Sequence, residues 1–360
     1  MSKITVPAHL QNEYYAISPE HVRISSAAAI ALGLKSGRVF RDAHCGCVNL
    51  LEHYPQGCFA NCVYCGLARE RPGVPEDNTF IRVAWPLYST QLVADKIAER
   101  EREGRIGRVC VSQVQDHRAN ADMIEILTRV HDAAPAVPLS ALVSATLLDE
   151  EWLRRIQATG VDIIGIGLDA ATEDVFNRTR GKDVRSPHDW DHHWQIIRAA
   201  RRLYGPLNVN CHIIVGLGET DRDLVNLFAQ LHAEQIAAFL FSFNPEPGSA
   251  MQDLPRQPIR RWRRVQLAKY LIENDRLTAH AIQFDAQDNI AAIDAPPQTL
   301  AETIVAGRAF MTNGCPDRSG NMTCNRPYGS YRPGEEFRDY PFVPTADDLP
   351  IIREQLGWDA

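Results

Sequence analysis

Val48-Asn-Leu-Leu-Glu-His53 is a short apolar run, and the loop that follows it, Gly57-Cys-Phe-Ala-Asn-Cys-Val-Tyr-Cys-Gly66, contains three cysteines. Short apolar runs of this kind are typical of buried strands. Similar runs recur along the chain, with longer segments of helical periodicity between most of them. A strand–helix order repeated in this way is typical of a parallel sheet covered on both faces.

The expected strands are the apolar runs Val48–His53, Arg108–Val114, Leu139–Ser144, Val161–Leu168, Leu207–Val215, Ala238–Phe243, His280–Phe284 and Ala309–Met311. Helices are expected at Gln91–Arg102, Ala121–His131, Asp149–Ala158, Asp221–Glu234 and Arg260–Asn274. The pattern predicts an α/β fold, a TIM-like (β/α) barrel that is complete or partly open. A doubly wound open sheet is the alternative.

The expected organisation has three parts, with the barrel over residues 48–314. Residues 1–47 form an N-terminal helical extension, in which Pro19–Leu34 is the expected helix because Ser18 suits an N-cap and Pro19 the first helical position. Residues 315–360 form a cysteine-containing C-terminal tail.

The composition excludes several classes of protein. The net charge of −7 argues against a general nucleic-acid binder. No apolar run approaches the ~18–20 residues of a membrane span, and Met1–Ser18 lacks the pattern of an export signal. We therefore expect a cytoplasmic protein without membrane or nucleic-acid partners, in which clustered cysteines indicate metal binding or catalysis.

The cysteine loop has the spacing CxxxCxxC, formed by Cys58, Cys62 and Cys65, with Tyr64 directly before the third thiol. Three thiolates hold three corners of a cubane iron–sulfur cluster and leave the fourth iron open for a substrate. A closed zinc knuckle, the alternative, normally takes four ligands in paired spacings. A disulfide arrangement fails because three is odd. Since the loop follows the first strand, we expect it at the barrel mouth, where reactive groups gather.

This motif resembles that of the radical S-adenosylmethionine (radical SAM) enzymes, CxxxCxΦC with an aromatic Φ, which is Tyr64 here. The resemblance implies a 4Fe–4S cluster whose open iron chelates the amino and carboxylate groups of SAM. It also implies that electron transfer splits SAM and yields a 5′-deoxyadenosyl radical, which abstracts hydrogen from an unactivated carbon.

A second stretch, His212-Ile-Ile-Val-Gly-Leu-Gly-Glu219, resembles the GxIxGxxE segment of the same family. Gly216 and Glu219 match, whereas His212 replaces the first glycine. The resemblance implies contact with the adenine of SAM. The plain alternative is an ordinary strand–helix turn.

Asp169 ends the fourth expected strand, and Arg178 and Arg180 follow it. The arrangement resembles that of biotin synthase and its relatives, which implies that Asp169 accepts ribose hydroxyls and that Arg180 binds the carboxylate of SAM. The alternative is that Asp169 is a helix N-cap and that both arginines are surface charges.

Four further cysteines indicate a second, auxiliary 4Fe–4S cluster. Cys315 and Cys324 follow the last expected strand, at the expected barrel mouth, and Cys45 and Cys47 precede the first one. If that strand starts at Cys47, the thiols of Cys45 and Cys47 lie up to ~20 Å below the mouth. They then meet Cys315 only if the strand is short or the C-terminal tail folds back. Lipoyl synthases complete such a site with a serine, so Ser330 is the alternative to Cys45 as fourth ligand.

Cys110 and Cys211 lie within the second and fifth expected strands. Biotin synthase holds a sulfide cluster with strand cysteines, but the further ligands that it uses have no counterpart here. We therefore interpret Cys110 and Cys211 as buried structural thiols.

The chain most resembles the biotin synthase/lipoyl synthase branch of radical SAM enzymes, closest to the two-protein (archaeal-type) lipoyl synthase subunits. The resemblance rests on Asn49-Leu-Leu51, Cys65-Gly-Leu-Ala-Arg69, Gly216–Glu219 and Cys324-Asn-Arg-Pro327. It implies sulfur insertion at C6 or C8 of an octanoyl chain on a lysine, with the auxiliary cluster as sulfur donor. The implied partners are an octanoylated lipoyl domain or glycine-cleavage H protein, a paralogous radical SAM protein, and an electron donor of the ferredoxin or flavodoxin type.

Two other functions remain open. One is another radical SAM reaction on a small molecule, of the biotin synthase, methylornithine synthase or hydrogenase-cofactor type, some of which need no second cluster. The other is a non-catalytic iron–sulfur or zinc scaffold.

Overall fold

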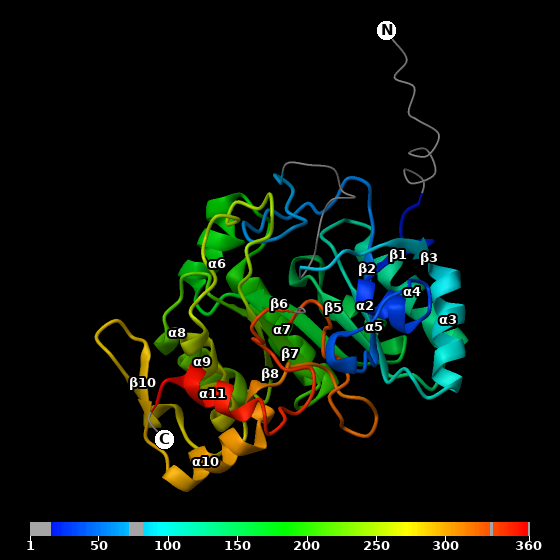
Figure 1. The fold of residues 1–360 in the computed structure, drawn as a ribbon. Helices are drawn as coiled ribbons and strands as arrows, with labels where there is room; N and C mark the ends of the chain where they lie inside the picture. The colour runs from blue at the N-terminus through cyan, green and yellow to red at the C-terminus, as the bar shows by residue number, and fades with distance from the viewer. Residues whose placement is uncertain (1–15, 72–81, 332–333, 359–360) are drawn as a thin grey trace.

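The computed structural model describes residues 16–71, 82–331 and 334–358. Its main feature is an eight-stranded sheet in the order β3-β1-β2-β4-β5-β6-β7-β8. Six of these strands run parallel: β2 (Cys47–Glu52), β4 (Arg108–Ser112), β5 (Leu139–Val143), β6 (Val161–Asp169), β7 (Val209–Val215) and β8 (Ala237–Ser242). The sheet is curved but open, which confirms the predicted α/β fold in its partly open form (Figure 1).

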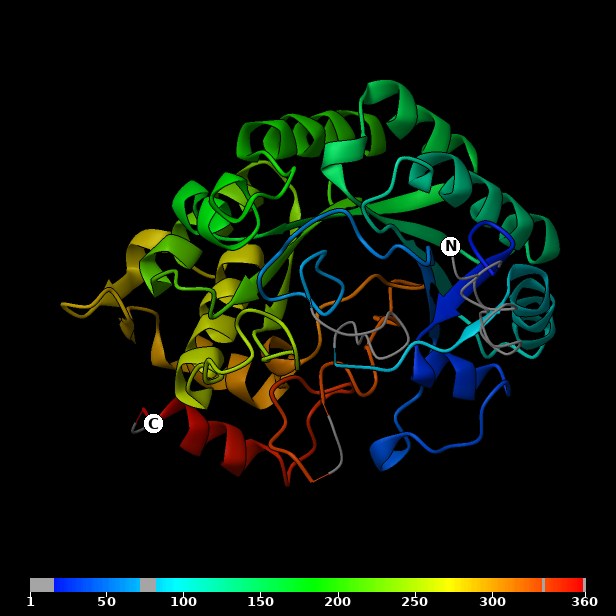
Figure 2. The same ribbon diagram turned by 90° about the horizontal axis from the view of Figure 1, so that it is seen from above.

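The outer face of the sheet is covered by helices, which form a ring around the arc of strands in Figure 2. They are α3 (Thr90–Arg102), α4 (Ala119–Ala133), α5 (Glu150–Ala158), α7 (Trp190–Tyr204), α8 (Asp221–Ala233) and α9 (Ile259–Glu273). Apart from α7, for which no bounds were predicted, they agree with the predicted helices to within a few residues, because each carries the apolar stripe that a helix needs for packing on a sheet.

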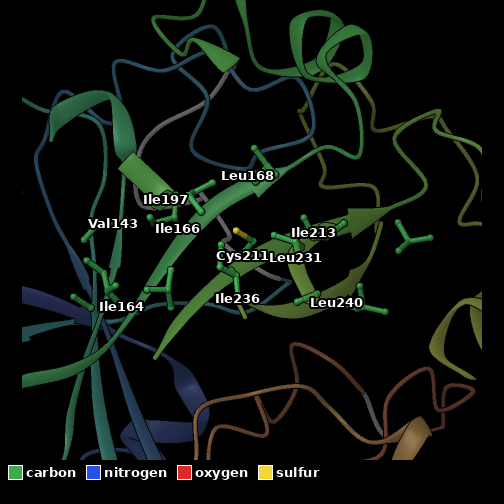
Figure 3. Packing of buried hydrophobic residues seen from close by; sticks show 14 of the residues in the cluster. Val143, Ile164, Ile166, Leu168, Ile197, Cys211, Ile213, Leu231, Ile236 and Leu240 are labelled. Carbon is green, nitrogen blue, oxygen red and sulfur yellow. The ribbon is translucent and has the colours of Figure 1, made fainter. Parts of the chain in front are cut away.

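The core between sheet and helices is formed by every second residue of the strands. Ile164, Ile166 and Leu168 of β6 are fully buried there, and Figure 3 shows them near Ile197 and Leu231 from the helical layer. The residues between them, Gly165 and Gly167, therefore face the interior of the barrel, as does Asp169 at the strand end.

The predicted N-terminal helix Pro19–Leu34 is wrong in its first half. His21–Ile24 forms strand β1, which pairs antiparallel with β2 and with β3 (Leu87–Ser89). His-Val-Arg-Ile alternates between half-buried and buried positions, which is the period of a strand. A helix, α2 (Ser26–Ala31), begins only after the N-cap Ser25.

The last two predicted barrel strands are also wrong. Ile282–Phe284 forms β9, which pairs with β10 (Ile290–Ile293) in a separate two-stranded sheet, and Arg308–Phe310 is a short 3₁₀ helix. Their apolar residues pack against helices instead of extending the main sheet. A short apolar run in the sequence does not distinguish these two arrangements.

The C-terminal part of the chain lies at the open side of the sheet (Figure 2). It attaches to the edge strand β8, because Arg326 donates to the carbonyl of Leu240 and Asn313 accepts from its amide. It also reaches the opposite side, where Asn325 donates to the carbonyl of His44 at 2.7 Å. The remaining helices are α6 (Glu173–Thr179), α10 (Pro297–Ala306) and α11 (Leu349–Leu356), which packs against α9.

Among the described residues, no helix is long and apolar enough to cross a membrane. Residues 1–15, and with them most of the segment in which no export signal is expected, lie outside the described part of the chain.

Candidate active site

A cavity of about 220 Å³ opens at the C-terminal ends of the parallel strands. All three loop thiols line it, together with polar and aromatic side chains from the strand ends: Gln113, Gln115, Ser144, Asp169, Arg180, His188, His212, Phe241 and Phe243. Leu51, Val114, Leu142 and Ile214 add apolar surface. The cavity therefore joins the cysteine loop to residues from most of the parallel strands.

The cysteine loop is fastened to three separate strand–helix connections. Phe59 donates its amide to the carbonyl of Gln115 after β4, and Val63 donates to Thr179 at the end of α6. The carbonyl of Val63 accepts from Met251 after β8. These backbone bonds orient the loop with its thiols toward the cavity, although the loop contains no regular element of its own.

The loop thiols suit an iron–sulfur cluster. Burial raises the pKa of Cys58 and of Cys65, and it raises that of Cys62 to about 12, so a thiolate here requires a compensating cation. Cys58 and Cys65 each accept a backbone N–H at 3.3 Å, from Gln115 and Leu67 respectively. Such donors are characteristic of the surroundings of cluster thiolates.

Within residues 16–71, 82–331 and 334–358, no three His, Cys, Asp or Glu side chains lie close enough together to hold a single metal ion. A cubane is larger than one ion and holds its thiolates farther apart. Three thiols that line one cavity are the donor set that such a cluster takes.

Asp169 connects two other predicted site residues. Its Oδ2 accepts from the hydroxyl of Tyr64 at 2.5 Å and from the guanidinium of Arg180. Asp169 adopts φ of +61°, in the left-handed region, where only glycine, asparagine and aspartate rest without much cost. This conformation ends β6 with the carboxylate on the cavity wall, and Thr172, not Asp169, is the N-cap of α6.

Arg180 lies beneath the cysteine loop and is 5% exposed. It also donates to the carbonyl of Gly167, and its Nε has no hydrogen-bond partner among the residues that the structure describes. Burial would lower the pKa of Arg180, but the facing Tyr64, Asp169, Cys62 and Cys65 raise it overall. A buried, charged guanidinium with an unused donor suits a carboxylate ligand. Arg178, by contrast, is half exposed and paired with Asp174.

The turn after β7 is held by its own glutamate. Glu219 accepts the amides of Gly216 and Leu217 at 2.8 and 2.9 Å and pairs with Arg261 at 2.8 Å. Neither Gly216 nor Glu219 lines the cavity, whereas Ile214 does. Glu219 is therefore a positioning residue, which shapes the turn without facing the cavity.

Several cavity residues escaped the sequence analysis, among them Gln115, Ser144 and His188. Ser144 donates to Gln115 at 2.6 Å, and the Nδ1 of His188 lies 2.6 Å from Thr146. Gln115 and Ser144 follow strand ends, which is the signal that could have singled them out, whereas His188 directly precedes α7 and carries no such signal. Gln113, which also lines the cavity, donates to Asn120 and accepts from the amide of Ser144.

The other cysteine set lies at the opposite end of the barrel interior. Cys47 opens β2, and it packs with Cys315 and Cys324 in one buried cluster. Arg108, the first residue of β4, donates to the carbonyl of Pro316 at 2.6 Å. The expectation that Cys315 and Cys324 lie at the mouth is therefore wrong: the tail folds back under the N-terminal ends of the strands.

The members of this set also differ from those expected. Cys110, predicted to be an isolated structural thiol, packs against the cluster of Cys47, Cys315 and Cys324. Cys45 is buried outside it, with its thiol directed at the carbonyl of Cys47 at 3.6 Å. Ser330 lines the upper cavity instead. Cys211 does lie in the core behind the sheet, as Figure 3 shows.

Amide side chains surround the second set of thiols. Asn49 donates to Cys47 and to Cys324, both at 3.6 Å, and Asn210 lies 4.0 Å from Cys315. The Cys47 thiol donates to Cys324 and lowers the pKa of Cys324, and the charges of Arg326 and Arg108 act in the same direction against burial. The set thus favours thiolate at one member at least.

Comparison with known proteins agrees with these features. Residues 54–231 match the sequence model of the family described as the radical SAM superfamily. A biotin synthase of Prochlorococcus marinus (strain MIT 9215) is 25% identical over 193 residues, 54% of this chain and 50% of that protein. A lipoyl synthase of Dechloromonas aromatica (strain RCB) is 22% identical over 185 residues, 50% of this chain and 52% of that protein.

The chain spans about half the length of these curated relatives. Among solved structures, methylornithine synthase aligns with a TM-score of 0.49 and 11% identity, over 69% of this chain and 66% of that one.

Proposed function

We propose, on the premise that this chain is a member of the radical SAM superfamily, that it inserts sulfur into an octanoyl chain carried on a protein lysine. One observation carries the proposal: two sets of cysteines lie at opposite ends of a single barrel interior. One set suits the radical cluster and the other suits a sulfur donor. A radical SAM reaction without sulfur transfer has no need of the second set.

The loop residues Cys58, Cys62 and Cys65 would hold the first 4Fe–4S cluster, and Cys47, Cys315 and Cys324 would contribute to a second one. The chemistry that these groups and SAM supply when bound is removal of hydrogen from an unactivated carbon and delivery of sulfur to it. An electron donor of the ferredoxin or flavodoxin type provides the reducing equivalent.

The chain's own part is to bind SAM in a fixed orientation. Asp169 faces the cavity with a carboxylate that suits two ribose hydroxyls, and Arg180 offers an unused Nε–H to the carboxylate of SAM. Tyr64 donates to Asp169 and so holds the carboxylate in place. These contacts fix the reacting end of the cofactor beside the cysteine loop.

The cavity wall between the two cysteine sets suits an acyl chain. Leu142, Ile214 and Phe241 contribute apolar surface there. His212, packed on Phe241 with ring centres 4.8 Å apart, is neutral, because burial lowers its pKa to about 3. A neutral imidazole leaves no charge beside the chain and excludes water from it.

A direct experiment tests the proposal. The intact chain, reconstituted anaerobically with iron and sulfide, is incubated with SAM, a strong reductant and an octanoyl-lysine peptide. Mass spectrometry should detect peptide that has gained one sulfur, together with 5′-deoxyadenosine. SAM cleavage without any thiolated peptide, in the presence of a full complement of about eight irons per chain, would contradict it.

Thiolation of a free small molecule is the second candidate, because biotin synthases recur among the relatives. The same assay distinguishes the two if free octanoate replaces the peptide in a parallel reaction. The carrier-bound substrate requires cytoplasmic lipoyl-domain or glycine-cleavage H proteins as partners, and a paralogous radical SAM protein would insert the other sulfur.

A further inference from the structure

Four thiols from three separate segments meet at the N-terminal end of the barrel. Cys47 comes from the start of β2, Cys110 from the third position of β4, and Cys315 and Cys324 from the tail. Cys110 and Asn49 are direct partners in the register of β2 and β4, so they lie side by side on the inner face. The thiol of Cys110 thus shares the interior with the other three.

The two residues expected to complete the set are engaged elsewhere. The Cys45 thiol donates to the backbone carbonyl of Cys47 at 3.6 Å, and although it interacts electrostatically with Cys324, Cys45 is not part of the packed group. The Ser330 hydroxyl accepts from Arg326 at 3.3 Å and lines the cavity at the other end. Neither observation applies to Cys110, whose neighbours in the group are the three thiols, Ile163 and Phe239.

The surroundings of the four thiols are those of an anionic cluster. Asn49 presents its amide N–H₂ to two of them, and Asn210, 2% exposed, presents its own to Cys315. The buried Oδ1 of Asn210 has no hydrogen-bond partner in the described part of the chain. Arg108, also 2% exposed, brings positive charge to the same end of the barrel. Donors and cations of this kind stabilise the sulfur atoms of an iron–sulfur cluster.

We propose that Cys110 is the fourth protein ligand of the second cluster, which is therefore held by Cys47, Cys110, Cys315 and Cys324. The inference rests on the proposed function, because it concerns the second cluster of that enzyme. It distinguishes the two clusters by coordination: the loop cluster has an open iron, whereas this one has a thiolate for each of its four irons. The strand cysteine and the tail cysteines then tie the two ends of the chain together inside the barrel.

The test counts iron in a background without the loop cluster. In the full chain carrying C58A, C62A and C65A, reconstitution with iron and sulfide should leave about four irons per chain. Adding C110S should lower this number at least twofold or alter the EPR spectrum of the reduced cluster, because an oxygen replaces a sulfur ligand. Adding C45S, or C211S as a second strand cysteine, should change neither.

Folding is monitored separately, because Cys110 is an interior residue. The metal-free forms of all variants are compared by circular dichroism and thermal unfolding, and C110A serves as a second substitution at the same position. If C110S and C110A keep about four irons with an unchanged spectrum, or if C45S loses them instead, the inference is overturned. A background that binds no iron overturns it as well.

Failure of this inference differs from failure of the proposed function. The inference concerns ligand identity and is read from iron content and spectra of the variants. The proposed function is read from thiolated peptide made by the unmodified chain. Thiolation with C110S still loaded would remove only the inference, and a fully loaded chain that makes no thiolated peptide would remove only the function.

Discussion

At Asp169, the backbone conformation and the contacts of the side chain depend on one another. Its left-handed backbone at φ of +61° turns the end of β6 so that the carboxylate reaches the cavity, where Tyr64 and Arg180 bind it. Conformations of this kind cost free energy and persist where the surroundings impose them. The position therefore restricts both the backbone and the side chain of the residue that occupies it.

Replacing Asp169 by Asn should weaken SAM binding about 10- to 100-fold, because a charged hydrogen-bond acceptor contributes roughly 1.5–3 kcal/mol. Asparagine tolerates the left-handed conformation, so the backbone should be retained. Binding is measured by equilibrium dialysis with labelled SAM on reconstituted protein. D174N is the matched control, since Asp174 is exposed and its ion pair is with Arg178, away from Asp169 and Tyr64. Equal affinities for D169N and D174N would contradict the assignment.

His193 should make the fold sensitive to acid. It is fully buried, its Nδ1–H donates to the carbonyl of Asp189 at 2.7 Å, and burial lowers its pKa to about 3. The unfolded chain binds the proton first, so stability is lost as pH falls from about 6.5 towards about 3. Within that pH range, His193 should lower the free energy of unfolding by about 1.4 kcal/mol for each pH unit.

The variant H193N keeps a donor near Asp189 but does not titrate. Urea unfolding of both proteins at pH 7 and at lower pH should show a smaller decline in the free energy of unfolding for the variant. The decline itself is compared, not the absolute stability, because the substitution also changes packing against Phe176. Identical declines would show that the pKa of His193 is not lowered by folding.

At the scale of an element, the turn Gly216–Glu219 shows how a short motif acts through its backbone. Gly216 adopts φ of +111°, and a Cβ built there would lie 2.7 Å from Gln257 Oε1 and 3.1 Å from Phe243 Cβ. Gly218 adopts nearly the same φ, +110°, but the nearest atom to its Cβ would be 3.7 Å away. Comparing substitutions at the two glycines therefore separates the cost of the backbone conformation from the cost of a steric clash.

Gly216→Ala should lower the free energy of unfolding by more than Gly218→Ala does. Placing alanine at positive φ costs about 1–3 kcal/mol at both positions, and only at position 216 does a steric clash add to it. Because the displaced neighbour Phe243 lines the cavity, G216A should also weaken SAM binding. Thermal unfolding and SAM binding are measured on both variants. Equal losses would show that conformation alone matters at this turn.

At the scale of the whole molecule, the C-terminal tail lies at the open side of the sheet and connects its two sides. It bonds to the edge strand β8 on one side and to His44 and Arg108 on the other. In the proposed enzyme the second cluster joins the same parts through thiolates. Since metal binding of this kind contributes directly to folding, the tail should be the region most dependent on the cluster.

Removal of the clusters by chelation should therefore increase hydrogen exchange in residues 312–326 by at least about tenfold, while amides of β6 stay protected. Mass-spectrometric hydrogen exchange of loaded and metal-free protein measures both regions at once. The C58A/C62A/C65A background separates the contribution of the second cluster from that of the loop. Unchanged hydrogen exchange in residues 312–326 would contradict the prediction that the second cluster stabilises the tail.

Local patterns in the chain predict much of this molecule. The alternation of apolar runs and amphipathic segments predicts eight strands, six of which form the parallel sheet, and most of their covering helices, because each element must bury one face. The spacing of Cys58, Cys62 and Cys65 predicts cluster chemistry from ligand number alone. Asp169 and Arg180 could be singled out since polar residues after parallel strands gather at one edge.

Contacts between distant segments follow from register and packing, which leave no mark on local periodicity. Whether His21–Ile24 is a strand depends on the edges of β2 and β3 that it pairs with. Whether the last apolar runs close the barrel depends on the helices that cover them. Cys110 reads as an ordinary core thiol until strand register turns it inward and the returning tail brings Cys315 and Cys324 beneath it. The sequence by itself identifies the cysteines, but only the tertiary structure brings their thiols together, because they come from segments that are distant in the chain.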